Sequence, residues 1–258
     1  MATSEVPWPE FKAGSIIATL KILDAADISV EDIAWVRGAL VLEGGLRGAD
    51  ARLLHTPGIQ PAIIRVNSSV RPAGRKRFAI AHELGHLELK HNPGSVTECA
   101  EKEFLAWYQT QNDQEVDANV FAAALLMPKK MFLKRLEGTV PSMELIEELA
   151  EFFQTTLTAT AIRYTQLCGE RCAVVFSKNA RIDWVRRSPD FGAWIPPKAK
   201  LSENTYAVDY HTRGNVSTKR ETARLDAWVE DASQWATIYE QSRPLPSYKS
   251  LLTLLSFR

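Results

Sequence analysis

The chain has 258 residues, enough for one large domain or two modest ones. Apolar residues make up 45% of it and charged residues 24%, a composition that excludes a disordered or fibrous chain. The 31 basic and 31 acidic side chains cancel, so no overall field drives non-specific binding to nucleic acid or to an anionic membrane.

The N-terminal part predicts two helices and then a small sheet. Apolar residues at helical spacing favour a first helix over residues 11–26. Asp27 and Ser29 can cap a second, short helix that runs through Val36. Runs of β-prone residues, separated by glycines and a proline, then indicate strands. The predicted strands are residues 39–43, 51–55 and 61–66.

The middle of the chain is predicted to be helical. A helix should begin at residues 72–75, where a proline suits the first turn, and run to about Lys90. A further helical segment is expected at residues 96–108. An alanine-rich helix over residues 114–127 then ends at Pro128.

Two short amphipathic helices, at residues 143–153 and 158–167, resemble a helix-turn-helix pair. From Cys172 onward the chain changes to short β-prone runs with prolines and glycines between them. The expected fold class is therefore α+β. The expected domains are a helix-and-sheet domain at 1–140, the helix-turn-helix-like pair at 141–170 and a mixed α+β module at 171–258.

Cysteine usage and hydropathy indicate the compartment. Cys99, Cys168 and Cys172 form a sparse, odd set without the framework of secreted domains, and we interpret them as free side chains with no metal role. The first residues show no signal-peptide pattern, and no apolar run reaches the roughly 18 residues of a membrane span. We therefore expect a cytoplasmic protein without membrane association.

The segment His82-Glu83-Leu84-Gly85-His86 fits the pattern H-E-x-x-H on a predicted helix. Residues four apart share one helix face, so His82 and His86 can bind one zinc ion. Glu83 is rotated by about 100° from His82, so it is poorly placed as a ligand but can act as general base on a water molecule at the metal. Apolar neighbours, typical of a buried helix, argue against a chance match. The pattern predicts a zinc hydrolase.

A catalytic zinc site needs a third protein ligand. His91 is the nearest candidate, but on a continuous helix it would lie about 140° around from His86. The metzincin pattern would require glycine and histidine where this chain has Leu89 and Asn92. The acidic candidates downstream are Glu98, Glu101, Glu103, Asp113, Glu115 and Asp117.

The alanine-rich helix is the best host for that ligand, because its small side chains allow close packing on the motif helix. Glu115, Ala118 and Asn119 share one of its faces. Such packing would bring Glu115 to the metal, and Asn119 could then hydrogen-bond the second ring nitrogen of a histidine. The alternative for Glu115 is a solvated acid, favoured by the dipole at a helix N-terminus.

Residues 75–130 resemble the ImmA/IrrE family of metallopeptidases. The matching segments are RKRFAIAHELGHLELKH and EVDANVFAAALLMP, the latter similar to the family signature E-x-E-A-N-x-F-A-x-x-L-L-M-P. Weaker similarity extends over roughly residues 28–184. Two departures are Asp117, where the signature often has glutamate, and about 20 extra residues at 92–111 between the ligand helices. The longer link can reshape the cleft.

This resemblance implies a minimal zincin-like domain in which His82, His86 and Glu115 bind Zn²⁺ and Glu83 is the general base. It also implies a cytoplasmic endopeptidase that cuts a helix-turn-helix transcriptional repressor of the XRE type and so relieves repression under stress. The expected partner is such a repressor.

Two rival functions come from other classes. The helix-turn-helix-like pair suggests a DNA-binding regulator, with Gln154, Arg163 and Gln166 as groove-type contacts. Acidic residues on its first helix would repel phosphate, so direct DNA binding is not expected. These acids are Glu144, Glu147, Glu148 and Glu151. The second rival is a protein-binding module with a structural zinc site, against which Glu83 beside the metal argues.

Two further features of the mechanism stay open. A donor besides the metal should stabilise the oxyanion, and Arg77, His91, Tyr108 and Tyr164 are equal candidates. An extended substrate is expected to align beside an edge strand such as residues 61–66.

Overall fold

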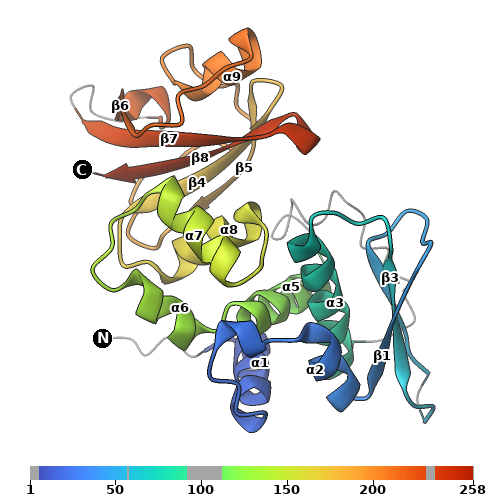
Figure 1. Ribbon diagram of the computed structural model, residues 1–258. Helices are drawn as coiled ribbons and strands as arrows, with labels where there is room; N and C mark the ends of the chain where they lie inside the picture. The colour runs from blue at the N-terminus through green and yellow to red at the C-terminus, as the bar shows by residue number, and fades with distance from the viewer. Residues whose placement is uncertain (1–5, 57, 92–111, 231–235, 258) are drawn as a thin grey trace. The chain divides into compact units, whose positions relative to one another are not determined.

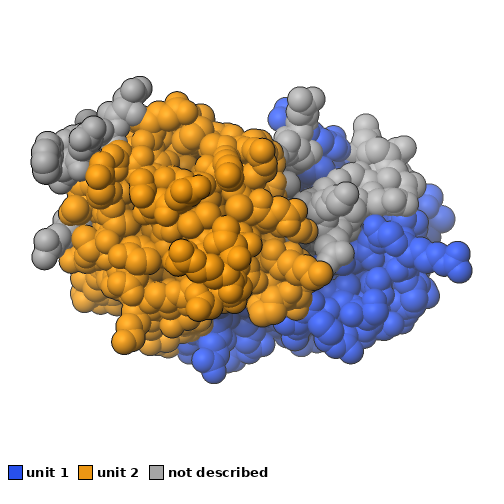
Figure 2. Space-filling view, turned by 90° about the horizontal axis from the view of Figure 1, so that it is seen from above, with its two compact units in different colours: residues 1–132, 150–159 blue, residues 133–149, 160–258 orange. Residues whose placement is uncertain are grey.

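The computed structural model (Figure 1) describes residues 6–56, 58–91, 112–230 and 236–257. The helical segment predicted at 96–108 lies outside them. The chain divides into two compact units (Figure 2): residues 1–132 with 150–159, here unit 1, and residues 133–149 with 160–258, here unit 2. The predicted boundaries at 140 and 170 remain a prediction, because compactness does not test which segments fold alone.

Unit 1 contains a three-stranded sheet and several helices, some of which contact the sheet and some of which pack on other helices. Its strands are β1 (Ala39–Gly44), β2 (Ala51–Leu54) and β3 (Ala62–Asn67). Its helices are α1 (Trp8–Thr19), α2 (Val30–Val36), α3 (Ala73–Glu88) and α5 (Asp113–Leu126), with a 3-10 turn at Ala25–Asp27. The strand order is β1-β3-β2, with β1 parallel and β2 antiparallel to β3.

The sequence predicts a strand at residues 61–66 and expects it at an edge of the sheet. The strand is present as β3, but the expected edge position is wrong, because β3 is the central strand. Ala62, Ile64 and Val66 are buried and alternate with half-buried residues, as in a strand with one covered face. The same alternation occurs in edge and central strands of a sheet covered on one side, so it does not report strand order. The edges of this sheet are β1 and β2.

The first two helices show how local sequence sets their ends. Helix α1 ends at Thr19, earlier than predicted, and Lys21 just beyond it has a left-handed backbone with φ of 54°. Ser29 caps α2, since its Oγ accepts the N–H of Asp32 at 3.3 Å. Asp27, the other predicted cap, lies within the preceding 3-10 turn.

Helices α3 and α5 pack side by side in unit 1 (Figure 1). A Cβ atom added to Gly85 would lie 3.1 Å from Phe121 Cδ1 and 3.2 Å from Ala118 Cα, so a side chain at this position would require α5 to move by a few tenths of an ångström. Ala118, Phe121 and Ala122 are fully buried at the contact. The alanine-rich helix therefore packs closely on the motif helix, as its small residues predict.

Helices α6 (Lys129–Leu136), α7 (Met143–Phe152) and α8 (Leu157–Leu167) follow. The two helices predicted at 143–153 and 158–167 are thus present. Residues 150–159, where α7 ends and α8 begins, belong to unit 1, and there Phe153 stacks on Phe132 with ring centroids 5.4 Å apart. The remainder of both helices belongs to unit 2.

Unit 2 contains a five-stranded antiparallel sheet of order β5-β4-β8-β7-β6. Its strands are β4 (Cys172–Lys178), β5 (Arg181–Arg187), β6 (Glu221–Arg224), β7 (Thr237–Leu245) and β8 (Ser250–Phe257). Helix α9 (Ala207–Arg213) and 3-10 turns at Leu225–Ala227 and Pro246–Tyr248 complete it. The central strands β4 and β8 are almost wholly buried. The predicted α+β class is confirmed.

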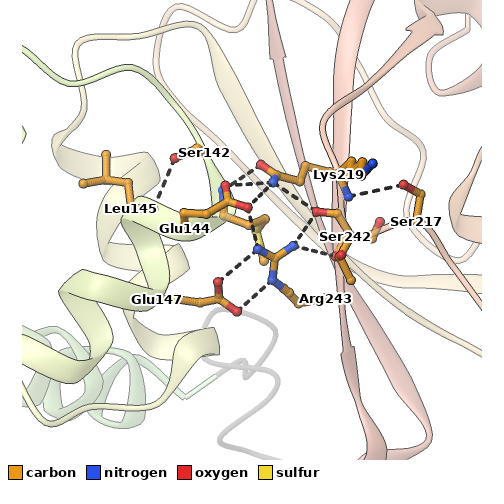
Figure 3. Close-up of polar contacts among 11 residues, drawn as sticks. Ser142, Glu144, Leu145, Glu147, Ser217, Lys219, Ser242 and Arg243 are labelled. Atoms are coloured by element: carbon orange, nitrogen blue, oxygen red, sulfur yellow. Dashed lines mark hydrogen bonds and ion pairs between the residues drawn. The ribbon is translucent and has the colours of Figure 1, made fainter.

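A polar network fixes the N-terminal part of α7 to β7 (Figure 3). Arg243 Nε donates to Glu147 Oε1, and Arg243 Nη2 donates to Glu144 Oε1, each at 2.7 Å. Gln241 accepts the N–H of Met143 at 2.8 Å and donates to Glu144 at 2.8 Å. Two of the acids expected to repel phosphate are thus paired with an arginine of the sheet.

Among the residues that the structure describes, no helix combines the length and the apolar character needed to cross a membrane.

Candidate metal centre

Helices α3 and α5 bring three potential ligands together. His82 and His86, one turn apart on α3, have their Nε2 atoms 2.9 Å apart. In the first turn of α5, Glu115 places Oε2 3.1 Å from His82 Nε2 and Oε1 3.2 Å from His86 Nε2. These three donors lie within 4.8 Å of one another, and in the described part of the chain they are the group of such residues gathered closely enough to hold a metal.

The chemistry of this group suits a divalent metal ion. Glu115 Oε1 is buried and accepts no hydrogen bond from the described residues, which is costly for a carboxylate oxygen unless a ligand completes its environment. Imidazole nitrogen and carboxylate oxygen are common metal ligands. Burial acts to raise the pKa of Glu115, whereas N–H groups or positive charge on the adjacent His82 and His86 act to lower it, and a cation held by the three side chains would lower it in the same way. The acid is therefore ready to bind a cation.

His82 is oriented by a residue of α5. Its Nδ1 lies 2.8 Å from Asn119 Oδ1, and both side chains are buried. An amide oxygen can only accept, so Nδ1 carries the proton and Nε2 presents its lone pair toward Glu115. Asn119 lies one turn beyond Glu115 on the same helix face.

His86 has a different outer partner, His91, which follows α3. The Nδ1 atoms of the two rings are 2.9 Å apart. Burial, together with the neighbouring His86, lowers the pKa of His91 to about 4, so the ring is neutral at pH 7. His91 therefore contacts His86, a candidate ligand, from its outer side and is not one of the three converging donors.

Glu83 lies buried on α3 between the two histidines of the motif. Its Oε2 accepts the backbone N–H of Leu53 in β2 at 2.9 Å. Burial raises the pKa of Glu83, and the neighbouring His82 and His86 partly offset this rise. A carboxylate held in one orientation, with a raised pKa, is suited to accept and release a proton.

The hydrogen bond from Leu53 locates this carboxylate at the edge of β2 that faces away from β3. Asn67 N–H donates to Asp50 O at 2.8 Å, so the facing residues 50 and 67 form a hydrogen-bonded pair of the β2–β3 ladder. Hydrogen bonding alternates along antiparallel strands, so residues 51 and 53 turn their backbone groups away from β3. The N–H of Leu53, which does not pair with β3, therefore donates to Glu83 instead.

The other sequence candidates do not join the centre. Arg77 Nη2 donates to the carbonyl of Ile28 at 2.9 Å. Tyr164 is buried in unit 2, where burial raises its pKa far above the usual value. Tyr108 lies outside the described residues, as do the downstream acids before residue 112. Cys168 and Cys172 are buried free cysteines of unit 2, with their Sγ atoms 3.2 Å apart.

Two histidines one turn apart, a carboxylate from a second helix and a buried glutamate beside the first histidine define the H-E-x-x-H class of metalloproteins. Residues 38–165 match the family model of the IrrE N-terminal-like domain. By this domain the chain belongs to the ImmA/IrrE family of metallopeptidases, as the resemblance of its motifs predicts.

The chain is also similar to a known metalloprotease, over part of its length, and to a solved structure, over nearly all of it. Over 106 residues the chain is 29% identical to the radiation response metalloprotease IrrE of Deinococcus radiodurans. That match covers 40% of this chain and 31% of the relative, so it spans about a third of the relative's length. A Mycobacterium tuberculosis transcriptional regulator has a similar structure, with a TM-score of 0.63 and 16% identity over 98% of this chain and 88% of that one. At such identity the likeness concerns the fold alone.

Proposed function

We propose that the chain is a zinc-dependent endopeptidase with a minimal zincin-like domain. The ligands are His82, His86 and Glu115, and Glu83 is the general base. The observation that carries this proposal is the convergence of three potential metal ligands beside a buried glutamate, Glu83, that is not itself one of the three. Two nitrogens and a carboxylate favour Zn²⁺ over Mg²⁺ or Ca²⁺, which take oxygen ligands, and three protein ligands leave a position open for catalysis.

A zinc ion bound there would polarise the scissile carbonyl and make a water molecule acidic enough to react at neutral pH. Glu83 would take the proton of the attacking water and pass it to the leaving amine. The N–H of Leu53 occupies Oε2 of this glutamate, so Oε1 is the oxygen that would receive the proton. Asn119 keeps His82 in the tautomer that binds metal.

The substrate, in our proposal, pairs with the free edge of β2 rather than with residues 61–66. The backbone N–H and carbonyl of Ala51 and the carbonyl of Leu53 face away from β3 and are those that an added strand would use. The N–H of Leu53, on the same edge, donates to Glu83, so a peptide along this edge would pass next to the general base.

The natural substrate we propose is a helix-turn-helix repressor of the XRE type, cut in the cytoplasm. The support is membership of the ImmA/IrrE family and similarity to a relative named a radiation response metalloprotease. The alternative is a DNA-binding regulator, and its support is the similarity of the fold to that of a protein named a transcriptional regulator. Arg163, its main groove contact, is only 3% exposed, so we favour a packing role for α8.

The test is to incubate the zinc-loaded protein with a repressor encoded beside its gene, in parallel with Glu83→Gln. Glu83→Gln keeps the three ligands, so it should bind zinc like the wild type but cut roughly 100-fold to 10,000-fold more slowly. An intact repressor with both proteins would reject this substrate. A DNA mobility shift that weakens with salt would favour the regulator instead.

A further inference from the structure

The chain after α3 folds back onto the last turn of that helix. Leu89 still has helical backbone angles, but Lys90 is left-handed with φ of 56°. The N–H of His91 donates to the carbonyl of His86 at 3.0 Å, and the N–H of Lys90 donates to that of Leu87 at 3.2 Å. This pair of hydrogen bonds is the Schellman motif, a common helix ending.

In a Schellman motif the residue after the left-handed position often contacts the residue five places earlier. Apolar side chains are usual at these two places, whereas here both are histidines. The rings of His86 and His91 meet edge to face, with centroids 5.0 Å apart and planes at 71°. The helix ending therefore aims His91 at the outer face of a proposed metal ligand.

The contact leaves the inner nitrogen of His86 available. His91 approaches Nδ1 of His86 at 2.9 Å, while Nε2 of His86 faces His82 and Glu115. Two neutral imidazoles joined through Nδ1 share one proton in an N–H···N bond. If His86 is the donor, its Nε2 lone pair points to the metal position, and His91 is the acceptor.

We propose that His91 is a positioning residue of the metal centre, which accepts the Nδ1–H of His86 and thereby holds the Nε2 lone pair of His86 toward the metal. The inference rests on the zinc site proposed above. It gives the two histidine ligands separate supports: Asn119, from α5, for His82, and the helix ending of α3 for His86.

The separate supports have a structural consequence. Asn119 is buried on a helix, so its position depends on the packing of α3 against α5. His91 is half-buried, and its position depends on one left-handed residue, Lys90. Glycine adopts this conformation without strain, whereas a β-branched residue opposes it. The orientation of His86 should therefore be sensitive to the residue at position 90.

The test compares His91→Ala with His91→Asn by competition for zinc against a chromophoric chelator. Alanine removes the acceptor, and losing such an outer partner typically lowers metal affinity 10–100-fold. The Oδ1 of asparagine can occupy the place of the imidazole Nδ1, so His91→Asn should recover most of the affinity. The visible spectrum of the Co²⁺-substituted protein should shift with His91→Ala and change little with His91→Asn.

Backbone variants provide a second measurement that leaves both histidines in place. Lys90→Gly should preserve zinc affinity and the Co²⁺ spectrum, whereas Lys90→Val should reproduce part of the His91→Ala effect. Thermal unfolding of the zinc-free proteins checks that each variant folds. If His91→Ala does not fold, the comparison of the two Lys90 variants decides the proposal.

Each outcome has a definite meaning. Wild-type zinc affinity and an unchanged Co²⁺ spectrum in His91→Ala would overturn the positioning role alone. Loss of zinc as complete as in His86→Ala would also overturn it, because His91 would then be a ligand. A wild-type protein that binds no zinc would reject the metal site itself, and the inference with it.

Discussion

The carboxylates of the candidate metal centre and those of the α7–β7 network are used in opposite ways. In the described part of unit 1, Glu83 and Glu115 are buried beside histidines and pair with no lysine or arginine. In unit 2, Glu144 and Glu147 pair with Arg243 at the surface. A buried acid without a compensating cation costs free energy. Acids retained in that state therefore indicate a binding or catalytic site, whereas the paired acids stabilise a contact between elements.

Burial alone does not separate the two uses. Glu240 of unit 2 is 1% exposed, yet its Oε1 accepts the N–H of Ala207 at 2.6 Å and its Oε2 accepts Nε1–H of Trp228 at 3.0 Å. Both oxygens are satisfied by the protein itself. Glu115 differs because its buried Oε1 accepts no hydrogen bond from the described residues. The unsatisfied oxygen, rather than burial, points to a ligand.

The largest expected effect contrasts Glu115 with Glu240. Glu115→Ala removes a ligand and should lower zinc affinity by roughly 1,000-fold or more, since loss of an outer hydrogen-bond partner alone costs 10–100-fold. Glu240→Ala should leave zinc affinity at the wild-type value. Competition with a chelator measures both, and equal losses would remove the distinction between the two buried acids.

The next effect concerns pH. Burial raises the pKa of Glu240 from 4.5 to about 7, against the hydrogen bonds from Trp228 and Ala207, so the folded state binds this proton more tightly than the unfolded state. The resulting stabilisation is fully present below pH 4.5 and is lost as the pH rises through 7, by about 3 kcal/mol in total. Denaturant unfolding at pH 5 and pH 8 should show a smaller difference for Glu240→Gln. An equal change in the free energy of unfolding between pH 5 and pH 8 in both proteins would contradict a raised pKa of Glu240.

A smaller effect concerns the helix contact that forms the site. Gly85→Ala adds a Cβ within 3.2 Å of the Ala118 backbone and should lower the free energy of unfolding by about 1–2 kcal/mol. Its matched control is Gly14→Ala in α1, where nothing lies within 4 Å. That change should stabilise the protein by up to about 1 kcal/mol through helix propensity. Stabilisation by both would mean that α3 and α5 tolerate a wider separation.

The smallest effect is expected at the α7–β7 network. Glu144 and Glu147 have side chains 57% and 44% exposed, so water screens their pairing with Arg243. Arg243→Ala should lower the free energy of unfolding by no more than about 1 kcal/mol. Denaturant unfolding at low and high salt would show the difference shrinking as salt rises. If Arg243→Ala lowered the free energy of unfolding by several kcal/mol, the pairing would have the strength of a buried ion pair, and the contrast with the acids of the metal centre would fail.

Much of the site follows from local sequence. The spacing of His82 and His86 determines that both face one side of a helix, because the helical repeat is set by the backbone. The same repeat puts Glu115 and Asn119 on one face of α5, and the alanines of that helix predict close helix packing. The resemblance to the ImmA/IrrE family then selects Glu115 among the acids that spacing alone leaves open.

Two features were decided by tertiary structure alone. The strand at 61–66 has the alternation of any half-covered strand, and its central place depends on pairing with segments distant in sequence. The N–H of Leu53 can donate to Glu83 only because β2 is an edge strand, so that no neighbouring strand takes this donor. A backbone donor carries no signature in the sequence.

The position of His91 depends partly on local sequence and partly on tertiary structure. If the helix continued past Glu88, His91 would point away from the metal position. The left-handed backbone found at Lys90 is not predicted by the sequence, because lysine rarely adopts it. The helix ending reverses the chain and brings the His91 ring to His86. The sequence by itself determines the residue types and their spacing within each helix, because those depend on the local backbone repeat. Which helix ends, strand edges and side chains meet depends on contacts that form only when the chain is folded.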